Sequence, residues 1–324
     1  MAGAMTESRR VGVLGASSLV GQCLLSRLAE AEWSVSAYSR RPGSDSAGVE
    51  WRQLPSAGGE EQTLFTTAAK AGIQPAAASG KPTPAWVCVA PIWVLPDYFS
   101  LLEAAGARRL VALSSTSRFT KIDSGDAAEA AVAACLIETE QRVAAWAESR
   151  GIEWLVLRPT LIYGLGRDRN IAEMARFIRR FRFFPVLGRA MGLRQPIHAD
   201  DVAQACVSAL SAAATANRAY DICGAETLPY RELVGRVFGA LGRSPRIVTV
   251  PLWAFRLAVA MVRHLPRCRH WSAAMAERMN RDLVFDCGDA RRDLGFAPRP
   301  FRPGREDVAP WDERTTPSAK GAPP

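Results

Sequence analysis

The sequence predicts an α/β fold in which a doubly wound parallel sheet is accompanied by a smaller, discontinuous C-terminal domain. Short apolar runs, such as residues 11–14 and 86–90, alternate with helical stretches in units of about 25–40 residues. A glycine-containing turn joins the first apolar run to the first helical stretch. The chain has 324 residues, which is enough for one large domain with a small cap.

The first strand leads into the turn Gly15-Ala-Ser-Ser-Leu-Val-Gly21. Gly15 allows a tight turn, and Gly21 allows the following helix to pack closely on the sheet. Backbone N–H groups and the helix dipole at such a helix start favour an anion, for example a pyrophosphate. Ser18 stands where the G-x-x-G-x-x-G form has its middle glycine, so the turn alone is a weak signal for a nucleotide.

The second strand, residues 35–38, ends in Ser39, Arg40 and Arg41 rather than in an acidic residue. An Asp or Glu there would bind the ribose hydroxyls of NAD, whereas arginines can pair with the 2′-phosphate of NADP. Arg40 and Arg41 therefore favour NADP(H) over NAD(H). The alternative is that they are solvated loop charges.

Later strands also end in polar or turn residues. Residues 43–84 give weak signals, with a strand at 49–54 and a helical stretch near 64–71. The strand 110–113 ends in the hydroxyl residues 114–117, which either contact a substrate oxygen or simply end the strand in a turn. A long Ala-rich helix, residues 127–149, precedes the last strand of this half.

Several separated blocks of the chain resemble the extended short-chain dehydrogenase/reductase superfamily, which includes nucleotide-sugar epimerases and dehydratases. The resemblance is strongest to its atypical members related to the NADPH-binding accessory subunit of respiratory complex I. The matching blocks are residues 15–21, 113–116, 158–164, 195–203 and 220–233, and residues 289–296 are similar to the family's C-terminal helix.

The resemblance implies a Rossmann-type domain at residues 8–165, completed by about 195–223, and a small substrate domain at 166–194 and 224–301. The tail 302–324 is rich in proline and charge and is expected to be disordered. The implied cofactor contacts are Gly15, Ser17, Ser18, Leu19, Val20, Gly21, Arg40, Arg41, Val89, Ala90, Pro91, Ser114, Pro159 and Ile162.

The sequence departs from the catalytic members of the superfamily on the long helix. Those enzymes use a Tyr-x-x-x-Lys pair, in which the lysine lowers the pKa of the tyrosine. Alignment on Glu140 puts Val132 and Leu136 at the two positions, and no tyrosine occurs between Tyr98 and Tyr163. A replacement proton donor would come from Lys121, Asp123, Glu138, Tyr163 or water.

Thr116 matches the family's substrate-orienting Ser or Thr, with Ser115 as the near alternative. For the substrate tail, the resemblance points to the basic aromatic segment at residues 171–184 and the residues after it. We expect an anionic small-molecule substrate, and a solvated amphipathic helix is the alternative. The candidate contacts are Tyr163, Arg176, Arg180, Arg189 and Arg194.

Other polar groups of the second half favour structural roles. His198 and the acidic pair that follows it match a family segment in which an Asp caps a helix. The apolar stretch 251–262 is too short to span a bilayer; it packs in the cap or contacts protein or lipid peripherally. His264, Cys268 and His270 match no established metal site, so we expect no metal.

Charge and cysteine content bear on partners and compartment. The net charge of +9 comes mostly from arginine, but no recognition pattern for nucleic acid accompanies it. Seven scattered cysteines indicate a reducing compartment. The N-terminus lacks an apolar secretion segment. We therefore expect a cytoplasmic protein, and the sequence gives no oligomeric state.

Two functional interpretations stay open. In the first, the protein is an NAD(P)-binding, epimerase/dehydratase-like oxidoreductase that acts on a nucleotide sugar or another bulky metabolite with nonstandard acid/base groups. In the second, it is a non-catalytic NADPH-binding sensor or assembly factor, as the missing Tyr-x-x-x-Lys pair would suggest. The persistence of the substrate-domain blocks favours the enzyme slightly.

Overall fold

The structure is a computed structural model of the full chain that describes residues 9–41, 43, 45, 48–54, 82–122, 124, 126–212, 215–251, 253 and 278–310. The chain forms two compact units. Unit 1 contains residues 1–160, 199–225 and 285–299, and unit 2 contains the rest. Asp123, the stretches 64–71 and 254–262, and the trio His264, Cys268 and His270 lie outside the described residues.

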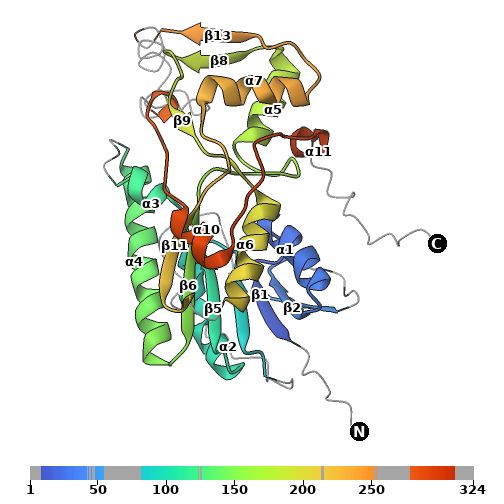
Figure 1. The fold of residues 1–324 in the computed structure, drawn as a ribbon, viewed down its shortest axis with the longest axis vertical. Helices are drawn as coiled ribbons and strands as arrows, with labels where there is room; N and C mark the ends of the chain where they lie inside the picture. The colour runs from blue at the N-terminus through green and yellow to red at the C-terminus, as the bar shows by residue number, and fades with distance from the viewer. Residues whose placement is uncertain are drawn as a thin grey trace, which may run out of the picture. The chain divides into compact units, whose positions relative to one another are not determined.

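Unit 1 contains a seven-stranded sheet in the order β11-β6-β5-β4-β1-β2-β3, with all neighbouring strands parallel (Figure 1). This topology confirms the predicted fold class. The chain crosses from one side of β1 to the other between β3 and β4, which creates a switch point beside β1. The strands are β1 (Arg10–Leu14), β2 (Ser34–Ser39), β3 (Val49–Gln53), β4 (Ala85–Cys88), β5 (Arg109–Leu113), β6 (Glu153–Pro159) and β11 (Arg218–Ile222).

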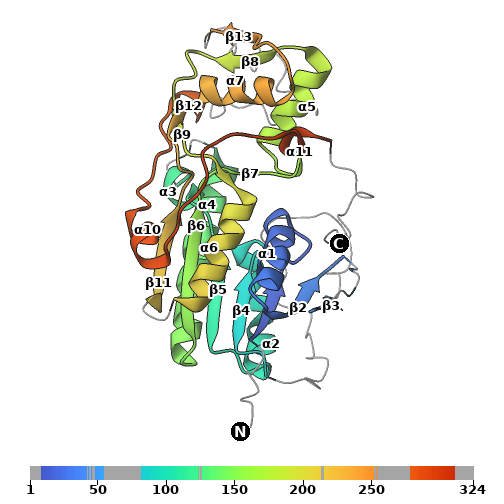
Figure 2. The ribbon, with the colours of Figure 1, turned by 45° about the vertical axis from the view of Figure 1, so that its right-hand side comes forward.

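Helices cover both faces of this sheet (Figure 2). On one side, α1 packs against α6, and on the other α4 packs against η1. The helices of unit 1 are α1 (Leu19–Glu30), the 3-10 helix η1 (Ile92–Tyr98), α2 (Phe99–Ala104), α3 (Ser117–Thr120), α4 (Ala127–Ser149), α6 (Ala199–Ser211) and α10 (Gly288–Leu294).

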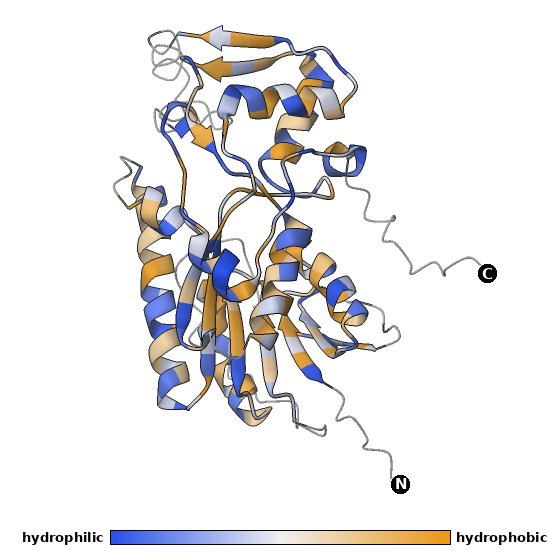
Figure 3. Ribbon diagram, viewed as in Figure 1, coloured by the Kyte–Doolittle hydropathy of each residue, from blue (hydrophilic) through white to orange (hydrophobic). Residues whose placement is uncertain are grey.

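The central strands are apolar throughout because both of their faces are buried. Leu110 and Ala112 of β5 belong to the same core as Leu136 and Val143 of α4. The alternating residue Val111 is also fully buried. Figure 3 shows hydrophobic residues gathered along these strands. Continuous apolar runs of this kind are typical of a parallel sheet covered by helices.

Unit 2 is built from short strand pairs around two helices. The core between α5 and α7 includes Ile178, Val237 and Phe238. Strands β10 and β13 pair in parallel with β7 and β8, whereas β12 and β9 are antiparallel. The elements are β7 (Ile162–Tyr163), α5 (Ile171–Phe181), β8 (Phe184–Leu187), β9 (Leu193–Arg194), β10 (Ile197–His198), β12 (Leu228–Pro229), α7 (Tyr230–Ala240), β13 (Ile247–Val250) and α11 (Arg305–Val308).

The expected disordered tail starts too early at residue 302. Residues 302–310 are described and contain α11, in which Asp307 and Val308 are buried. The Asp307 carboxylate accepts hydrogen bonds from the amides of Gly304 (2.8 Å) and Leu165 (3.1 Å). These tertiary contacts order a segment whose composition alone is typical of disorder.

Candidate functional site

The turn after β1 is closely packed against the end of β4. Gly15 has a φ of +85°, and a Cβ at this position would lie 2.5 Å from the amide nitrogen of Ala90. A Cβ on Gly21 would lie 2.4 Å from the carbonyl oxygen of Gly15. Both glycines are therefore required by the backbone path, as expected for a turn that brings a helix start close to an anionic ligand.

Ser18 caps the helix that follows this turn. Its side-chain oxygen accepts a hydrogen bond from the amide of Gly21 at 3.0 Å. The amides of Leu19 and Val20 have no acceptor among the described residues, as is usual for the first turn of a helix. An anion at this helix start would therefore be held by backbone N–H groups, while the Ser18 hydroxyl serves the helix itself.

The two arginines after β2 are exposed and begin directly beside the same turn. The buried Ser39 hydroxyl lies 2.7 Å from that of Ser17 and accepts a hydrogen bond from the amide of Arg41 (3.0 Å). Burial raises the pKa of the Tyr98 phenol, and the neighbouring charge of Arg40 partly counteracts this. Two exposed guanidinium groups and unused helix amides fit a phosphorylated dinucleotide.

The structure places the remaining unit 1 candidates at the carboxyl edge of the same sheet. Val89, Ala90 and Pro91 follow β4, and both Val89 and Ala90 donate their amides to the carbonyl of Leu14, at 2.9 and 3.2 Å. Ser114 follows β5, and Pro159 ends β6. Ile162, the remaining predicted cofactor contact, belongs to β7 of unit 2.

The two candidate catalytic hydroxyls differ in their partners. Thr116 is buried, and its hydroxyl donates to the carbonyl of Pro159 at 3.2 Å, which its own amide also reaches at 3.2 Å. Ser115 is half-buried and accepts a hydrogen bond from the amide of Ser117 at 3.1 Å. A hydroxyl that only accepts can still donate its proton to a ligand.

A buried ionic cluster next to these hydroxyls was not predicted from the sequence. The Glu140 carboxylate accepts hydrogen bonds from Ser114, Arg118 and Arg158, and Arg158 Nη2 lies 2.6 Å away. Burial raises the pKa of Asp221, with Arg158 acting in the opposite direction. Its Oδ1 lies 3.7 Å from Arg158 Nη1. The residues come from β5, α3, α4, β6 and β11, so no local motif announces the cluster.

The helix positions where the superfamily has its tyrosine and lysine carry no proton donor. Leu136 is buried in the sheet core, and Val132 packs against that core. Of the candidate replacements, Lys121 Nζ lies 3.9 Å from Glu129, and Glu138 is exposed. The structure thus retains the departure that the sequence shows.

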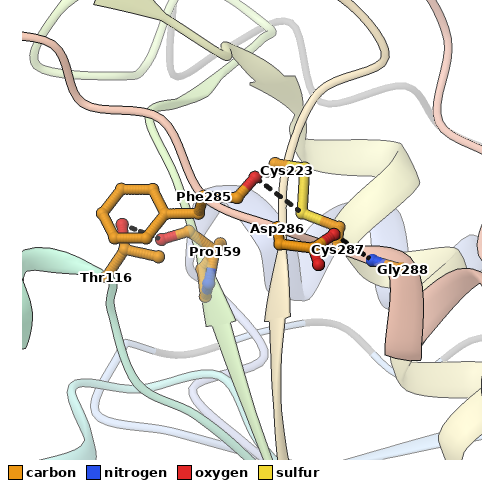
Figure 4. The surroundings of a disulfide bond; sticks show 7 residues. All are labelled: Thr116, Pro159, Cys223, Phe285, Asp286, Cys287 and Gly288. Carbon is orange, nitrogen blue, oxygen red and sulfur yellow. Dashed lines mark hydrogen bonds between the residues drawn. A yellow bond between two sulfur atoms is a disulfide. The ribbon is translucent and has the colours of Figure 1, made fainter.

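A disulfide joins Cys223, just after β11, to Cys287, just before α10 (Figure 4). The expectation that all cysteines are scattered and unpaired is therefore wrong. The two residues are 64 positions apart, so their spacing gave no signal. Phe285 lies beside this disulfide and near Thr116 in Figure 4, and its ring centroid lies 6.1 Å from that of Phe119.

In unit 2, two of the predicted substrate contacts are used internally. Tyr163 is 1% exposed, and its ring packs edge-on against His198 and Phe301. The buried Arg194 guanidinium donates to the carbonyls of Leu193, Arg281 and Arg278, and burial lowers its pKa. The side chains of Arg176, Arg180 and Arg189 are exposed.

The polar segment at the start of α6 is held by ion pairs. Asp200 Oδ1 accepts from Arg27 Nε at 2.8 Å, and Asp201 Oδ1 accepts from Arg299 Nε at 2.8 Å. His198 Nε2 lies 3.1 Å from Asp307 Oδ1. These contacts support the structural role expected for the segment, although the partners shown are arginines.

Comparisons with known proteins agree with this geometry. Residues 97–223 match the NAD dependent epimerase/dehydratase family. The uncharacterized protein y4nG of Sinorhizobium fredii is 30% identical over 151 residues, which cover 46% of this chain but only 37% of y4nG. The 2-alkyl-3-oxoalkanoate reductase of Stenotrophomonas maltophilia is 26% identical over 318 residues, covering 90% of this chain and 95% of the reductase.

A mitochondrial relative supports the more specific resemblance. Subunit 9 of the NADH dehydrogenase [ubiquinone] 1 alpha subcomplex of Arabidopsis thaliana is 28% identical over 110 residues, covering 34% of this chain and 26% of that subunit. Among solved structures, MoeE5 in complex with UDP-glucose and NAD has a TM-score of 0.63 at 20% identity, covering 92% of this chain and 97% of MoeE5. Of the helices in the described parts of the chain, none has the length and apolar character needed to cross a membrane.

Proposed function

We propose that this chain, which belongs to the NAD dependent epimerase/dehydratase family through residues 97–223, is an oxidoreductase that binds NADP(H) at the turn after β1. The observation that carries the proposal is the helix start at Leu19 and Val20, whose amides remain available beside a turn that excludes side chains at Gly15 and Gly21. Backbone amides at such a position suit a pyrophosphate.

The preference for NADP(H) rests on Arg40 and Arg41. Both are exposed after β2, where an acidic residue would otherwise bind the ribose of NAD. The hydrogen bonds of Ser39 to Ser17 and to the Arg41 amide fix the backbone from which the two side chains extend. A 2′-phosphate would form charge-assisted hydrogen bonds with these guanidinium groups.

The chemistry requires a hydride and a proton. When bound, the nicotinamide supplies or accepts the hydride. Thr116 orients the substrate oxygen, and the Ser115 hydroxyl, which accepts only from the Ser117 amide, is the second donor. The proton comes from Lys121 or water, because Tyr163 is buried and Glu138 faces solvent. This assignment replaces the missing Tyr-x-x-x-Lys pair.

We assign the substrate to the class of bulky anionic metabolites with a ketone or secondary alcohol. Both a nucleotide sugar and an oxo acid belong to this class, and the names of MoeE5's ligand and of the Stenotrophomonas reductase favour one each. Arg176 and Arg189 are the exposed candidates for the anionic group. Tyr163 and Arg194 act indirectly, by holding the segments that surround them.

The cofactor assignment predicts a selective loss in the double variant Arg40→Ala/Arg41→Ala. Two lost charge-assisted hydrogen bonds should weaken NADPH binding by roughly 10- to 100-fold and leave NADH binding unchanged. Fluorescence titration with each cofactor measures this. The control Arg108→Ala/Arg291→Ala removes two exposed arginines elsewhere in unit 1 and should bind both cofactors normally. An unchanged NADPH/NADH ratio in the first variant would refute the phosphate contact.

Turnover distinguishes the enzyme from the non-catalytic alternative. Protein with bound NADPH should oxidise it when UDP-sugars with a keto group or 2-alkyl-3-oxo acids are added, and absorbance of the reduced nicotinamide follows the reaction. Tight NADPH binding without oxidation by either class would favour the sensor or assembly interpretation instead.

A further inference from the structure

A cluster of exposed aromatic and cationic side chains lies on unit 2, where α5 ends and β8 begins. Phe181 is 50% exposed and Phe183 is 36% exposed. We call this surface the basic aromatic patch; its members are Phe181, Phe183, Arg179, Arg180, Arg182, Arg243 and Arg246. The proposed cofactor site in unit 1 does not involve it.

The local fold holds the two phenylalanines outward in a fixed arrangement. Arg182 ends α5 in the left-handed conformation, with a φ of 68°. The ring of Phe183 then lies 6.4 Å from that of Phe181, and both pack against the half-buried Phe177, at 5.8 and 4.7 Å. The next residue, Phe184, is buried in the core and donates its amide to the carbonyl of Arg246 at 2.9 Å.

The arginines of the patch gather without counter-charges. Arg243 Nη1 donates to the carbonyls of Ile178 (2.8 Å) and Arg179 (3.3 Å) at the end of α5. Burial and the charge of Arg243 both lower the pKa of Arg179. In the parts of the chain that are described, none of the five arginines forms an ion pair with a carboxylate.

The sequence around the patch reinforces this imbalance. No Asp or Glu occurs between residues 174 and 199 or between residues 233 and 276. Arg180 lies over the Phe181 ring, with 5.7 Å between the guanidinium carbon and the ring centroid. Like charges that cluster without carboxylates create a positive field that attracts an anionic partner.

We propose that the basic aromatic patch docks the protein on the surface of a bilayer that contains anionic phospholipids. The phenylalanine rings enter the boundary between headgroups and acyl chains, and the arginines pair with lipid phosphates. Trp253, three positions beyond β13, is 71% exposed and supplies the kind of aromatic side chain enriched at this boundary.

A lipid surface fits the patch better than a nucleic acid. Base stacking requires an accessible flat ring face. The Phe177 and Phe183 rings are at 87° to each other, and Phe181 and Phe183 are at 58°. Tilted rings that cover one another offer edges rather than a stacking platform, and ring edges insert readily among lipid chains.

Sedimentation of the full chain with vesicles tests the proposal. Vesicles of phosphatidylcholine mixed with phosphatidylglycerol should bind the protein on the order of 100-fold more tightly than phosphatidylcholine alone, and high salt should reduce this difference. Absence of binding to the anionic vesicles would overturn the proposal. So would a tighter interaction of the patch with single-stranded DNA than with these vesicles.

Two sets of variants assign the binding to the patch. Arg180→Glu/Arg182→Glu/Arg246→Glu should weaken vesicle binding on the order of 100-fold or more, because each arginine near an anionic surface contributes roughly fivefold. The control Arg142→Glu/Arg291→Glu/Arg302→Glu makes the same charge change at exposed sites outside the patch. Equal losses in the two triple variants would mean that net charge, not the patch, drives binding, and would overturn the assignment.

The aromatic contribution is tested separately from charge. Phe181→Ser/Phe183→Ser should weaken binding at least about tenfold, because apolar surface no longer enters the bilayer. Ile122→Ser/Val284→Ser removes comparably exposed apolar side chains outside the patch and should bind normally. Circular dichroism checks that each variant is folded. Normal binding by the phenylalanine variant would refute insertion of the rings.

Discussion

At the scale of single residues, two neighbouring hydroxyls at the end of β5 have different partners. Thr116 matches the family's substrate-orienting position, yet its hydroxyl donates to the carbonyl of Pro159. The Thr116 amide reaches the same carbonyl, so the hydroxyl can turn toward a substrate without leaving that carbonyl unpaired. The local cost of using Thr116 in catalysis is therefore small.

We expect Thr116→Val to lower kcat about 100-fold or more and to leave NADPH affinity unchanged. Valine has nearly the same shape but cannot donate a hydrogen bond to the substrate oxygen. The experiment uses a substrate identified by the NADPH oxidation assay. Thr120→Val, in the same short helix, is the control and should retain activity. Full activity of Thr116→Val would remove the residue from the mechanism.

Among the residues, those of the turn could be predicted, whereas the Glu140 cluster could not. Gly15 and Gly21 are recognised from sequence because their backbone demands are local. Glu140, Arg158 and Asp221 meet only after α4, β6 and β11 have assembled. Pattern analysis along the chain has no access to such a contact.

At the scale of elements, the strands of unit 1 were predictable because a buried parallel strand requires a continuous apolar run. The short helix α11 was not, because its residues Arg305–Val308 are mostly charged. Its order depends on Asp307, which contacts His198 and the amides of Leu165 and Gly304. Those partners lie more than a hundred positions away, apart from Gly304.

Asp307 should make the stability of the protein depend on acidic pH. Burial raises the pKa of its carboxyl, but the hydrogen bonds from His198, Gly304 and Leu165 outweigh burial and hold the pKa below its usual value. A carboxyl with a lowered folded pKa stabilises the fold above its unfolded pKa, about 3.9, and that contribution is lost as pH falls through the folded pKa.

Asp307→Asn should therefore lower the free energy of unfolding by about 1–3 kcal/mol at neutral pH, and this cost should shrink as pH falls below about 4. Urea denaturation across acidic and neutral pH measures both quantities. The neighbouring exposed Glu306→Gln is the control and should change stability by less than about 0.5 kcal/mol. A cost for Asp307→Asn that stays constant with pH would contradict the account.

At the scale of the whole molecule, the connectivity of the two units could be predicted only in outline. The sequence blocks indicated that unit 2 is discontinuous, because family-like segments return to the sheet after each excursion. The disulfide was missed, since Cys223 and Cys287 flank one such excursion, residues 226–284. Only the folded path of the chain brings its two ends together.

Reduction of this disulfide should destabilise the protein. Opening a loop of 64 residues restores chain entropy to the unfolded state, which corresponds to about 4 kcal/mol in the loop-closure model. Denaturation with and without a thiol reductant measures the difference. Cys135→Ser, which removes an unpaired cysteine, should respond to reductant like the unmodified protein. Cys223→Ser should not respond, and identical curves for the unmodified protein with and without reductant would disprove the stabilisation.

The central claim is that backbone amides at the start of α1 bind the dinucleotide phosphates. Leu19 is the first residue of this helix, and the preceding Ser18 is extended, with a ψ of 168°. Proline is tolerated at such a position, so Leu19→Pro removes one N–H group and preserves the helix. Leu19→Ala keeps the amide and provides the control for the lost side chain.

The most direct measurement is the affinity of these two variants for NADPH, with thermal denaturation as a check on folding. The account predicts that Leu19→Pro binds roughly 10- to 100-fold more weakly than Leu19→Ala, because a hydrogen bond to a charged phosphate is lost. Equal affinities of the two folded variants would contradict it.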